Sequence, residues 1–422
     1  MRRYKKIALV ISMLGGFILL LSQCNNHIEP GNDVRGKRYA GSVSCRQCHQ
    51  AIYDSFANTS HFNATAGSIK DHIHGGFESV QGPSDSIHRS LNSFVYNTHQ
   101  KIVLEKRDSG YYQVLYEDGT EKKAYRFDIL FGRKHAQTAL YWQDDQTYEL
   151  PLSYYTVLNG WATSPGFSNS LPNFSRFIGT DCFECHSSYI NKLLNASTKG
   201  ITESLQKETL ITGIDCERCH GPALNHVNYH LDNPDEKIAK YIQLNNTFSR
   251  QQKLDACAVC HSGNDKLKVE SRFRFKMGDT LENFFMQRPV TGKTTEFDVH
   301  GNQYSLLSES KCFRNSNTMT CATCHDPHKD ASQNLAAYSQ QCMTCHNEVT
   351  KKFCPKLDSI GVSIKTDCIS CHMPQQPSRA ITFLTAGSNT PSSYLLRTHK
   401  IAIYPDSVKN VHAPVAMISK QH

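Results

Sequence analysis

Seven cysteine pairs in this chain share one spacing, and each pair is followed directly by histidine. The cysteines are Cys45 and Cys48, Cys182 and Cys185, Cys216 and Cys219, Cys257 and Cys260, Cys321 and Cys324, Cys342 and Cys345, and Cys368 and Cys371. The histidines that follow them are His49, His186, His220, His261, His325, His346 and His372. Cysteines three residues apart share one face of a helical turn, where they can bond the two vinyl groups of one porphyrin while the next imidazole binds its iron. The pattern predicts seven covalently attached haem c groups.

Chance and other cysteine chemistry explain this pattern poorly. Histidine makes up 21 of the 422 residues, so seven such histidines arise by chance with a probability on the order of one in a billion. Zinc ribbons also use Cys-x-x-Cys pairs, but they do not require histidine at the next position. Disulfide frameworks suit short secreted chains. Haem attachment is therefore favoured, with zinc sites and disulfides or redox dithiols as the weaker alternatives.

Each haem iron has a second axial position that the motif leaves unfilled. A second histidine there gives a six-coordinate, low-spin electron-transfer centre, whereas an empty position lets a substrate bind the iron. Of the 21 histidines, 14 lie outside the seven motifs. The composition therefore allows a second histidine for every haem, without showing that each haem has one.

The N-terminus carries the features of an export signal. Basic residues at positions 2, 3, 5 and 6 precede an apolar stretch over residues 7–21, which is short for a membrane span and typical of a signal peptide. We predict that residues 1–23 are this signal. Leu21 stands three positions before Cys24, as in a bacterial lipobox, although Gln23 departs from the small residue usual there. We expect an exported protein of a Gram-negative bacterium, either periplasmic or a lipoprotein anchored at Cys24, with ordinary cleavage or an uncleaved anchor as alternatives.

The positive formal charge does not indicate a nucleic-acid partner. The chain carries +8, and removing the four basic residues of the signal leaves +4. Each ferric haem contributes roughly −1 and each ferrous haem roughly −2, so seven haems would bring the protein to about −3 oxidised and about −10 reduced. We expect no nucleic-acid binding.

The apolar content predicts an unusual core. Apolar residues make up 39% of the chain, against the ~45–50% of average domains, and porphyrins would supply the missing apolar surface. We expect a mainly α-helical and irregular multihaem cytochrome wrapped around a haem stack, with a small antiparallel β-rich insertion. The expected parts after the signal are a single-haem segment over residues 24–92, a haem-free β-rich insertion over 93–175 and a six-haem region over 176–422.

Local patterns place elements within these parts. Residues 101–105 and 111–116 read as strands around a turn at 107–110, and further strands are expected at 124–130, 138–142 and 147–152, with a turn at 144–145. A short helix is expected after His49, and a second amphipathic helix at 201–210. The insertion shows no chemistry of its own, and we expect a lid or docking platform.

Several segments resemble bacterial multihaem c-type cytochromes related to the tetrahaem electron acceptor of hydroxylamine oxidation. The resemblance is carried by residues 39–49 with Ile52-Tyr53 and Ser60-His61, by Cys219-His-Gly-Pro222 with His226, and by residues 297–300, 310–312, 319–328, 371–374 and 397–401. It covers most of the chain after the signal. It implies that His61, His226, His328 and His399 are distal haem ligands, with His300 as a fifth and His135 and His230 as weaker candidates. Because the tetrahaem members have fewer motifs, the resemblance does not show which distal histidine serves which haem.

Two further cysteines lie outside the motifs. Cys312 and Cys354 are expected to form a disulfide in an oxidising compartment, with two buried thiols as the alternative.

The preferred hypothesis is an exported seven-haem c-type cytochrome that transfers electrons in a respiratory chain. Its expected partners are a quinol-linked membrane complex, other cytochromes or a terminal reductase, and the membrane itself through the lipid anchor. The alternative is an enzyme, a multihaem oxidoreductase with one open iron acting on a small nitrogen or sulfur oxyanion or on hydroxylamine. A distal histidine for every haem favours the carrier, and a shortage favours the enzyme.

Overall fold

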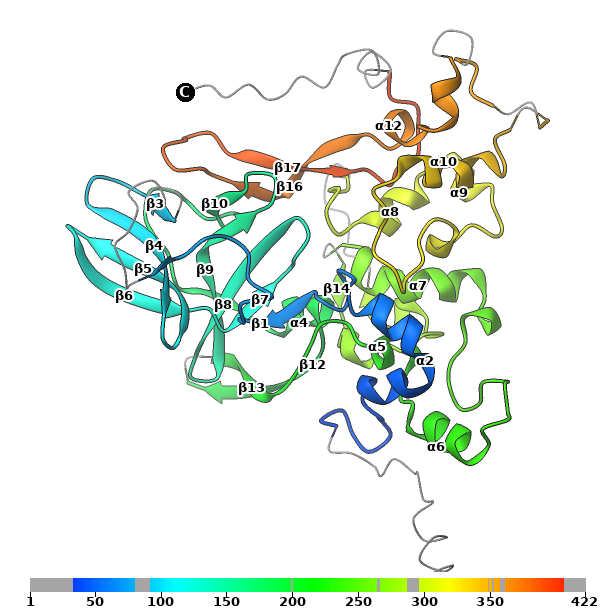
Figure 1. Cartoon of the computed structure of the whole chain (residues 1–422), viewed down its shortest axis with the longest axis horizontal. Helices are drawn as coiled ribbons and strands as arrows, with labels where there is room; N and C mark the ends of the chain where they lie inside the picture. Colours follow the sequence, from blue (N-terminus) through cyan, green and yellow to red (C-terminus); the bar gives the residue numbers. More distant parts are fainter. Residues whose placement is uncertain are drawn as a thin grey trace, which may run out of the picture.

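The computed structural model describes residues 33–79, 92–198, 200–263, 266–286, 296–347, 349–350, 353–356 and 361–405. The strands of residues 65–178 form one side of the molecule, and the short helices that carry the cysteine motifs form the other (Figure 1). The expected signal at 1–23 and Cys24 lie outside the described residues. Within the described ranges, every helix is too short or too polar to span a membrane.

The β-rich side consists of two sheets. One sheet has the order β1-β7-β8-β9-β10, with β11 also paired to β9, and the other has the order β2-β4-β5-β6, with β3 also paired to β4. The pairs are antiparallel except β2 with β4, which is parallel. The strands are β1 (Thr65–Gly67), β2 (Glu78–Ser79), β3 (Ser93–Val95), β4 (Gln100–Arg107), β5 (Gly110–Glu117), β6 (Thr120–Arg126), β7 (Ile129–Phe131), β8 (Ala136–Gln143), β9 (Gln146–Tyr155), β10 (Gly160–Thr163) and β11 (Arg176–Ile178).

The hairpins expected from the sequence are confirmed in this region. Strands β4 and β5 pair from Gln100 opposite Glu117 to Arg107 opposite Gly110, around the turn expected at 107–110. Strands β8 and β9 flank the expected turn at 144–145, where Asp144 has a φ of 54°, a conformation that aspartate tolerates in tight turns. The two sheets share one apolar core, whose fully buried members include Ile102, Leu104, Leu150 and Leu152.

The motif side is built from short helices and two long hairpins. The helices are α2 (Ser42–Phe56), α4 (Thr180–His186), α5 (Cys216–His220), α6 (Leu224–Asp232), α7 (Arg250–His261), α8 (Gln303–Ser308), α9 (Lys311–Arg314), α10 (Leu335–Met343) and α12 (Ile369–His372), with 3-10 turns η1 (Asn245–Thr247), η2 (Arg272–Arg274), η3 (Leu281–Asn283), η4 (Cys321–Thr323) and η5 (Val362–Lys365). The hairpins are β12 (Ser187–Ser197) with β13 (Gly200–Thr212) and β16 (Gln375–Phe383) with β17 (Ser392–Arg397), and a small pair joins β14 (Leu267–Lys268) to β15 (Phe285–Met286).

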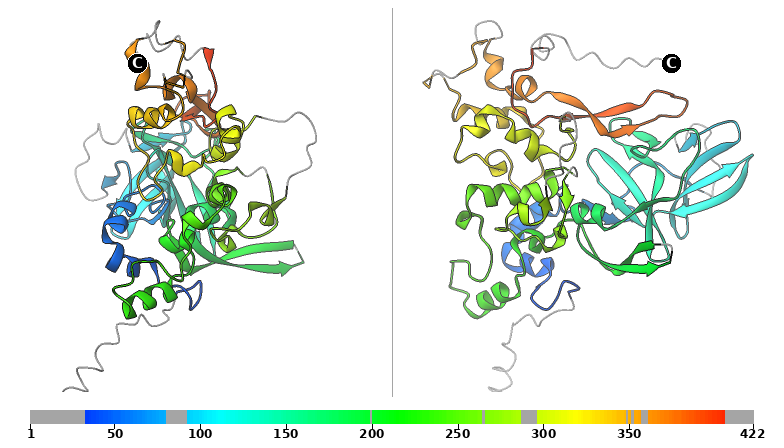
Figure 2. Two further views of the ribbon diagram at one scale, coloured as in Figure 1. Left: turned by 90° about the vertical axis from the view of Figure 1, so that its right-hand side faces the viewer. Right: turned by 180° about the vertical axis from the view of Figure 1, so that it is seen from behind.

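Two expectations about secondary structure are wrong. About 30% of the described residues lie in strands and only 25% in helices, so the fold is not mainly α-helical. The helix expected at 201–210 is instead strand β13, which pairs with β12 from Ser197 opposite Gly200 to Ser187 opposite Thr212 and extends away from the body of the molecule (Figure 2). Pairing with a distant segment outweighs a weak local helical pattern, and both long hairpins lie within the region that was expected to be helical.

The β-rich side is packed against the motif side at two places. Phe183 of α4, with Ile190 and Leu205 of the β12–β13 hairpin, packs against Ile129 and Leu140. The β16–β17 hairpin packs on β9 and β10 through a second apolar cluster made of Tyr155, Ala162, Phe383 and Tyr394. The sheets therefore act as a scaffold that fixes α4, which carries the second motif, and the hairpin that follows the seventh motif.

Candidate haem-binding centres

Each motif lies on or next to a short helical turn, which brings its side chains together. The second motif ends α4, and the third occupies all of α5. In the last three motifs, the amide of His325, His346 or His372 donates a hydrogen bond of 2.9–3.0 Å to the carbonyl oxygen of the first cysteine of its motif. This four-residue turn places both cysteines and the imidazole on one side of the backbone. That is the arrangement that two thioethers and one axial nitrogen require.

The motifs contact one another through their cysteines. Hydrogen-bonded thiol pairs join different motifs: Cys45 with Cys216, Cys185 with Cys260, Cys257 with Cys321, and Cys342 with Cys368. The hydrogen bond to Cys321 and burial raise the pKa of Cys257, and a negative charge on nearby Cys219 raises it further.

The same reasoning places the sixth motif beside the fifth. The hydrogen bond to Cys368 and burial raise the pKa of Cys342, and a negative charge on nearby Cys324 raises it further. The motifs therefore follow one another in space in the order first, third, fourth, fifth, sixth and seventh, and the second motif branches off at the fourth.

Four motif histidines each face a histidine from elsewhere in the chain. Between ring centroids, the pairs are His49 with His226 at 6.4 Å, His61 with His261 at 6.1 Å, His220 with His328 at 6.0 Å, and His325 with His399 at 6.2 Å. An iron with bonds of about 2 Å to two imidazole nitrogens, each about 1.1 Å in front of its ring centroid, separates the centroids by about 6.2 Å. The spacing of all four pairs therefore fits one iron between the rings.

The partner in each pair is one of the four histidines that the family resemblance implies as distal ligands. The fifth, His300, lies near the second motif: burial and, to a smaller extent, a positive charge on His300 lower the pKa of His186 to about 4. The weaker candidates make other contacts. Nδ1 of His135 shares a hydrogen bond of 3.0 Å with the hydroxyl of Tyr394, and His230 packs edge-on against His226.

The last two motifs differ from the others in their surroundings. His346 is exposed. Within the part of the chain that the structure describes, no histidine makes ring contact with His372, whose Nδ1 shares a hydrogen bond of 2.8 Å with the carbonyl oxygen of Ala402. Four of the histidines outside the motifs, His27, His88, His412 and His422, lie outside the described residues.

The outer ring nitrogens of several of these histidines are held by carbonyl oxygens. Nδ1 of His220 lies 3.3 Å from the carbonyl oxygen of Gln243, and Nδ1 of His226 lies 2.7 Å from that of Lys240. A proton held on Nδ1 in this way leaves Nε2 free to bind a metal. Burial also lowers the pKa of His399 to about 4, so its imidazole is neutral near pH 7, the form that binds iron.

The second motif is held by the β-rich side. The ring of Phe131, on β7, stacks on the ring of His186 with centroids 4.8 Å apart and planes 8° apart. The hydroxyl of Thr65, on β1, donates a hydrogen bond to the carbonyl oxygen of His186. The insertion that was expected to be a lid or platform thus fixes the orientation of one candidate iron ligand.

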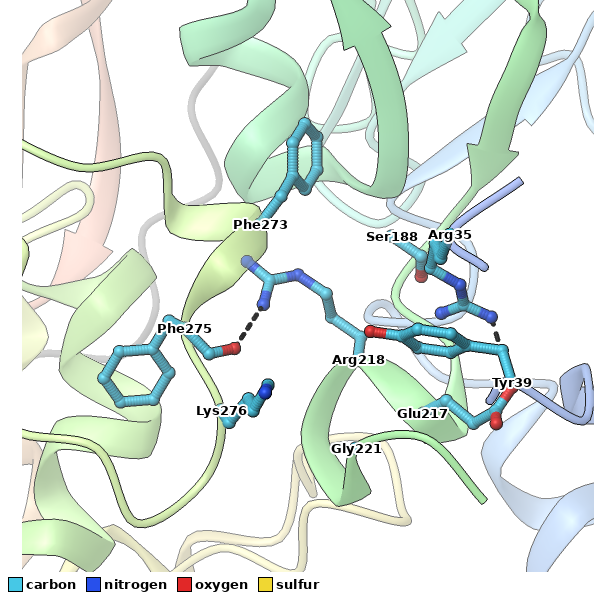
Figure 3. Close-up of a pocket in the computed structure, with 9 residues that line it drawn as sticks. All are labelled: Arg35, Tyr39, Ser188, Glu217, Arg218, Gly221, Phe273, Phe275 and Lys276. Atoms are coloured by element: carbon cyan, nitrogen blue, oxygen red, sulfur yellow. Dashed lines mark hydrogen bonds and ion pairs between the residues drawn. The ribbon is translucent and has the colours of Figure 1, made fainter. Parts of the chain in front are cut away.

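A small polar pocket beside the third motif ties this motif to the N-terminal segment (Figure 3). Arg35 forms ion pairs with Asp33, Asp215 and Glu217, at 2.9, 2.9 and 3.2 Å. The other oxygen of Glu217 accepts hydrogen bonds from the amides of Ala40 and Ala223, both at 2.9 Å. Because these charged groups are largely buried, their ion pairs and hydrogen bonds hold the third motif in a fixed position relative to the first.

The sequence reasoning missed this cluster. The sequence feature that could have revealed this cluster is the pair of charged residues, Glu217 and Arg218, between the two cysteines of the third motif. Arg218 reaches the opposite wall of the pocket, where it donates hydrogen bonds of 2.7 and 3.4 Å to the carbonyl oxygens of Arg272 and Phe275.

The arrangement of motifs and paired histidines can be compared with known proteins. The chain is similar to cytochrome c554 and c-prime. The family match covers residues 44–93 and 170–221, which contain the first three motifs. Among curated proteins none matches the sequence. The fold is similar to that of the outer cell wall cytochrome OcwA, with a TM-score of 0.53 and 16% identity over 88% of this chain and 81% of that one.

These similarities support a multihaem c-type cytochrome with covalently bound haem c. A family match confined to two segments does not extend to hydroxylamine oxidation, so that relation stays a prediction.

The expected disulfide is not formed, because Cys312 and Cys354 are both free thiols. Cys354 instead lies near Cys371. Burial and the charges of neighbouring groups raise the pKa of Cys371.

Proposed function

We propose that this chain is an exported c-type cytochrome that holds seven haems and transfers electrons between redox partners. Each motif supplies two thiols and one imidazole to one haem, and His61, His226, His300, His328 and His399 supply distal imidazoles. When bound, haem c provides a one-electron iron couple at each site. The protein contributes attachment, axial ligands and a fixed order of sites.

The observation that carries this proposal is the close approach of cysteines from different motifs: paired thiols join the first motif to the third, the second and the fifth to the fourth, and the sixth to the seventh, and Cys219 and Cys324 lie near the next pair in the series. A cysteine in such a motif bonds to the edge of its own porphyrin. Two motifs whose thiols touch therefore hold two porphyrin edges close together. The series runs from the first motif, near the N-terminus, to the seventh, near residue 372, and a carrier needs such continuity between the place where electrons enter and the place where they leave.

The surroundings of the histidines support the same role. Two imidazoles facing each other at 6.0–6.4 Å would hold an iron low-spin in both oxidation states, so little rearrangement would accompany the change of charge. Held outer nitrogens fix the ring orientation and increase the basicity of the ligand. These are properties of a centre built to exchange electrons.

We further propose a place and partners for the protein. Attachment of haem c takes place outside the cytoplasm, and the N-terminal features support export followed by anchoring through Cys24. The negative charge expected of the haem-loaded protein favours partners with a basic docking surface. A quinol-linked membrane complex on one side, and a cytochrome or terminal reductase on the other, would place it in a respiratory chain.

The seventh motif favours a second candidate function. Within the described residues, no imidazole makes ring contact with His372, so an iron held there would be a candidate for an open position. An open iron would make the chain an oxidoreductase acting on a small nitrogen or sulfur oxyanion or on hydroxylamine.

One experiment distinguishes these functions. Haem content is measured by pyridine haemochrome and intact mass, and low-temperature EPR of the fully oxidised protein counts low-spin and high-spin iron. Seven haems that are all low-spin support the carrier. A high-spin signal that shifts on addition of nitrite or hydroxylamine supports the oxidoreductase. Fewer than seven haems would contradict the proposed assignment of the motifs.

A further inference from the structure

The fourth motif occupies the junction of the series of sites. The thiol of Cys260 is hydrogen-bonded to Cys185 of the second motif, and the thiol of Cys257 to Cys321 of the fifth. Cys219 of the third motif lies close enough to influence both. The haem attached at the fourth motif would therefore adjoin the haems of three other motifs. Its redox potential would govern electron transfer along the series of haems and to the haem of the second motif.

The axial histidines of this motif are oriented differently from the other pairs. The ring planes of His61 and His261 are 80° apart. In the other three pairs the planes are 14°, 11° and 29° apart. Two parallel imidazole planes split the iron orbitals that interact with them, whereas perpendicular planes leave those orbitals nearly equal in energy. A perpendicular pair therefore gives a low-spin EPR signal with a distinctly larger highest g value.

The proximal histidine of this motif also has a different hydrogen-bond partner. Nδ1 of His261 lies 3.1 Å from the side-chain oxygen Oε1 of Gln303. The corresponding nitrogens of His220 and His372 meet backbone carbonyl oxygens instead. A side-chain partner can be exchanged by substitution without changing the backbone, so the contact at His261 can be tested directly.

The position of Gln303 is fixed by the packing of α8 against the end of α7. The amide of Gly263 donates a hydrogen bond of 2.8 Å to the carbonyl oxygen of Gly301. Gly263 has a φ of +80°, and a Cβ at this position would overlap the side chain of Asn302. The absence of a side chain at Gly263 thus lets the loop approach closely enough to place Gln303 beside His261.

We propose that Gln303 is a positioning residue that sets the redox potential of the haem bound at Cys257 and Cys260. Its Oε1 accepts the Nδ1 proton of His261, which fixes the ring plane across that of His61 and determines how strongly the imidazole donates to the iron. A stronger acceptor makes the imidazole a stronger donor, stabilises ferric iron and lowers the potential; loss of the acceptor has the opposite effect. This inference rests on the proposed function.

The test uses the haem-loaded protein and two substitutions with opposite expected effects. The EPR signal of the fourth site is identified by its loss in His61→Ala, and its potential is followed by EPR-monitored redox titration. Gln303→Glu should shift this potential to more negative values, and Gln303→Leu to more positive values. The highest g value should fall in Gln303→Leu, where the ring plane of His261 is no longer held.

A matched control adds the same charge elsewhere. Gln341 is exposed and directly precedes the sixth motif, so Gln341→Glu should leave the signal of the fourth site unchanged. The inference is overturned if both Gln303 variants shift the potential in the same direction, if neither shifts it beyond the control, or if all signals shift alike. Haem content distinguishes a failure of this inference from a failure of the proposed function. A Gln303 variant with normal haem content and an unchanged potential contradicts only the role of Gln303. A wild-type protein that contains no haem contradicts the proposed function itself.

Discussion

At the scale of single residues, the role of each histidine outside the motifs depends on which group its ring faces. His226 lies opposite His49 with its Nδ1 held by a backbone carbonyl oxygen. His230, four residues later on the same helix, contacts the side of His226 rather than a motif histidine. The spacing of 6.0–6.4 Å between ring centroids therefore separates candidate ligands from neighbouring histidines better than burial does.

Removing one distal histidine tests this distinction. In His399→Ala, the iron bound by His325 should lose its sixth ligand, so one haem should change from low-spin to high-spin while haem content stays constant. EPR and the high-spin absorption band measure this change. The matched control is His135→Ala, which removes a histidine bonded to Tyr394 and should leave the spin states unchanged. An unchanged low-spin count in His399→Ala would contradict the assignment.

Glu149 predicts a pH dependence at the same scale. This carboxyl is 7% exposed on β9, 3.2 Å from Arg176, and burial raises its pKa from 4.5 to about 7 in spite of that cation. Between pH 4.5 and about 7, the carboxyl of Glu149 thus keeps its proton in the folded protein but loses it in the unfolded chain. The contribution of Glu149 to the free energy of unfolding is therefore fully present below pH 4.5 and is lost as the pH rises to about 7. Glu149→Gln should remove this loss and be more stable than the wild type at pH 8, by at most roughly 3 kcal/mol.

Denaturation of both proteins at pH 5 and pH 8, followed by circular dichroism, measures the difference. The gain of Glu149→Gln over the wild type should be small at pH 5 and larger at pH 8. Glu282→Gln, at an exposed glutamate, is the control and should show no such change. An equal gain at both pH values would show that Glu149 is ionised throughout.

At the scale of elements, the end of β13 holds the segment that contains His61. The amide of Ile214 donates a hydrogen bond of 2.9 Å to the carbonyl oxygen of His61. Gly213, just before it, has a φ of +64°, and a Cβ at this position would overlap the carbonyl oxygen of Phe62. The close approach of the two backbones depends on glycine, so one hairpin end determines where a distal ligand lies.

Gly213→Ala should therefore affect both stability and a haem site. The positive φ and the overlap should together cost about 2 kcal/mol or more, and displacement of His61 should weaken the EPR signal with the largest g value. In the control Gly119→Ala, φ is also positive at +77°, but a Cβ would meet nothing within 4 Å. Its expected cost is about 1 kcal/mol, with an unchanged EPR spectrum. If the two variants behave alike, the contact with Phe62 does not hold His61.

At the scale of the whole molecule, the two sides have different sources of stability. The larger apolar core lies between the two sheets and is drawn from residues 94–174. On the motif side, many of the histidines and cysteines are exposed or only half-buried in the polypeptide alone. The apolar surface that would cover them is that of the porphyrins, as the low apolar content of the sequence indicated.

The protein made without haem attachment should therefore fold only in part. Limited proteolysis with mass spectrometry should give a resistant fragment around residues 92–178, whereas residues 216–405 should be cut rapidly. The haem-loaded protein, digested in parallel, should resist over both sides. Equal and rapid cutting of both sides of the haem-free protein would show that the sheets also need haem to fold.

The sequence by itself determined the features that depend on local spacing. The seven motifs are read from five consecutive residues each, and the β4–β5 and β8–β9 hairpins from β-rich runs around short turns. The resemblance to known cytochromes also pointed to His61, His226, His328 and His399, because short flanking segments mark them. Spacing within a few residues is fixed by the geometry of a single turn or hairpin, so no knowledge of the rest of the chain is needed.

Only the tertiary structure decided what depends on distant contacts. It paired His49 with His226 and His220 with His328, placed the second motif as a branch at the fourth, and brought Gln303 to His261. It also placed residues 201–210, which were expected to form a helix, in strand β13, because hydrogen bonds to β12 outweigh a weak local preference. Which of several equivalent histidines or strands meet is set by the packing of segments far apart in the chain, and no pattern of neighbouring residues records that choice.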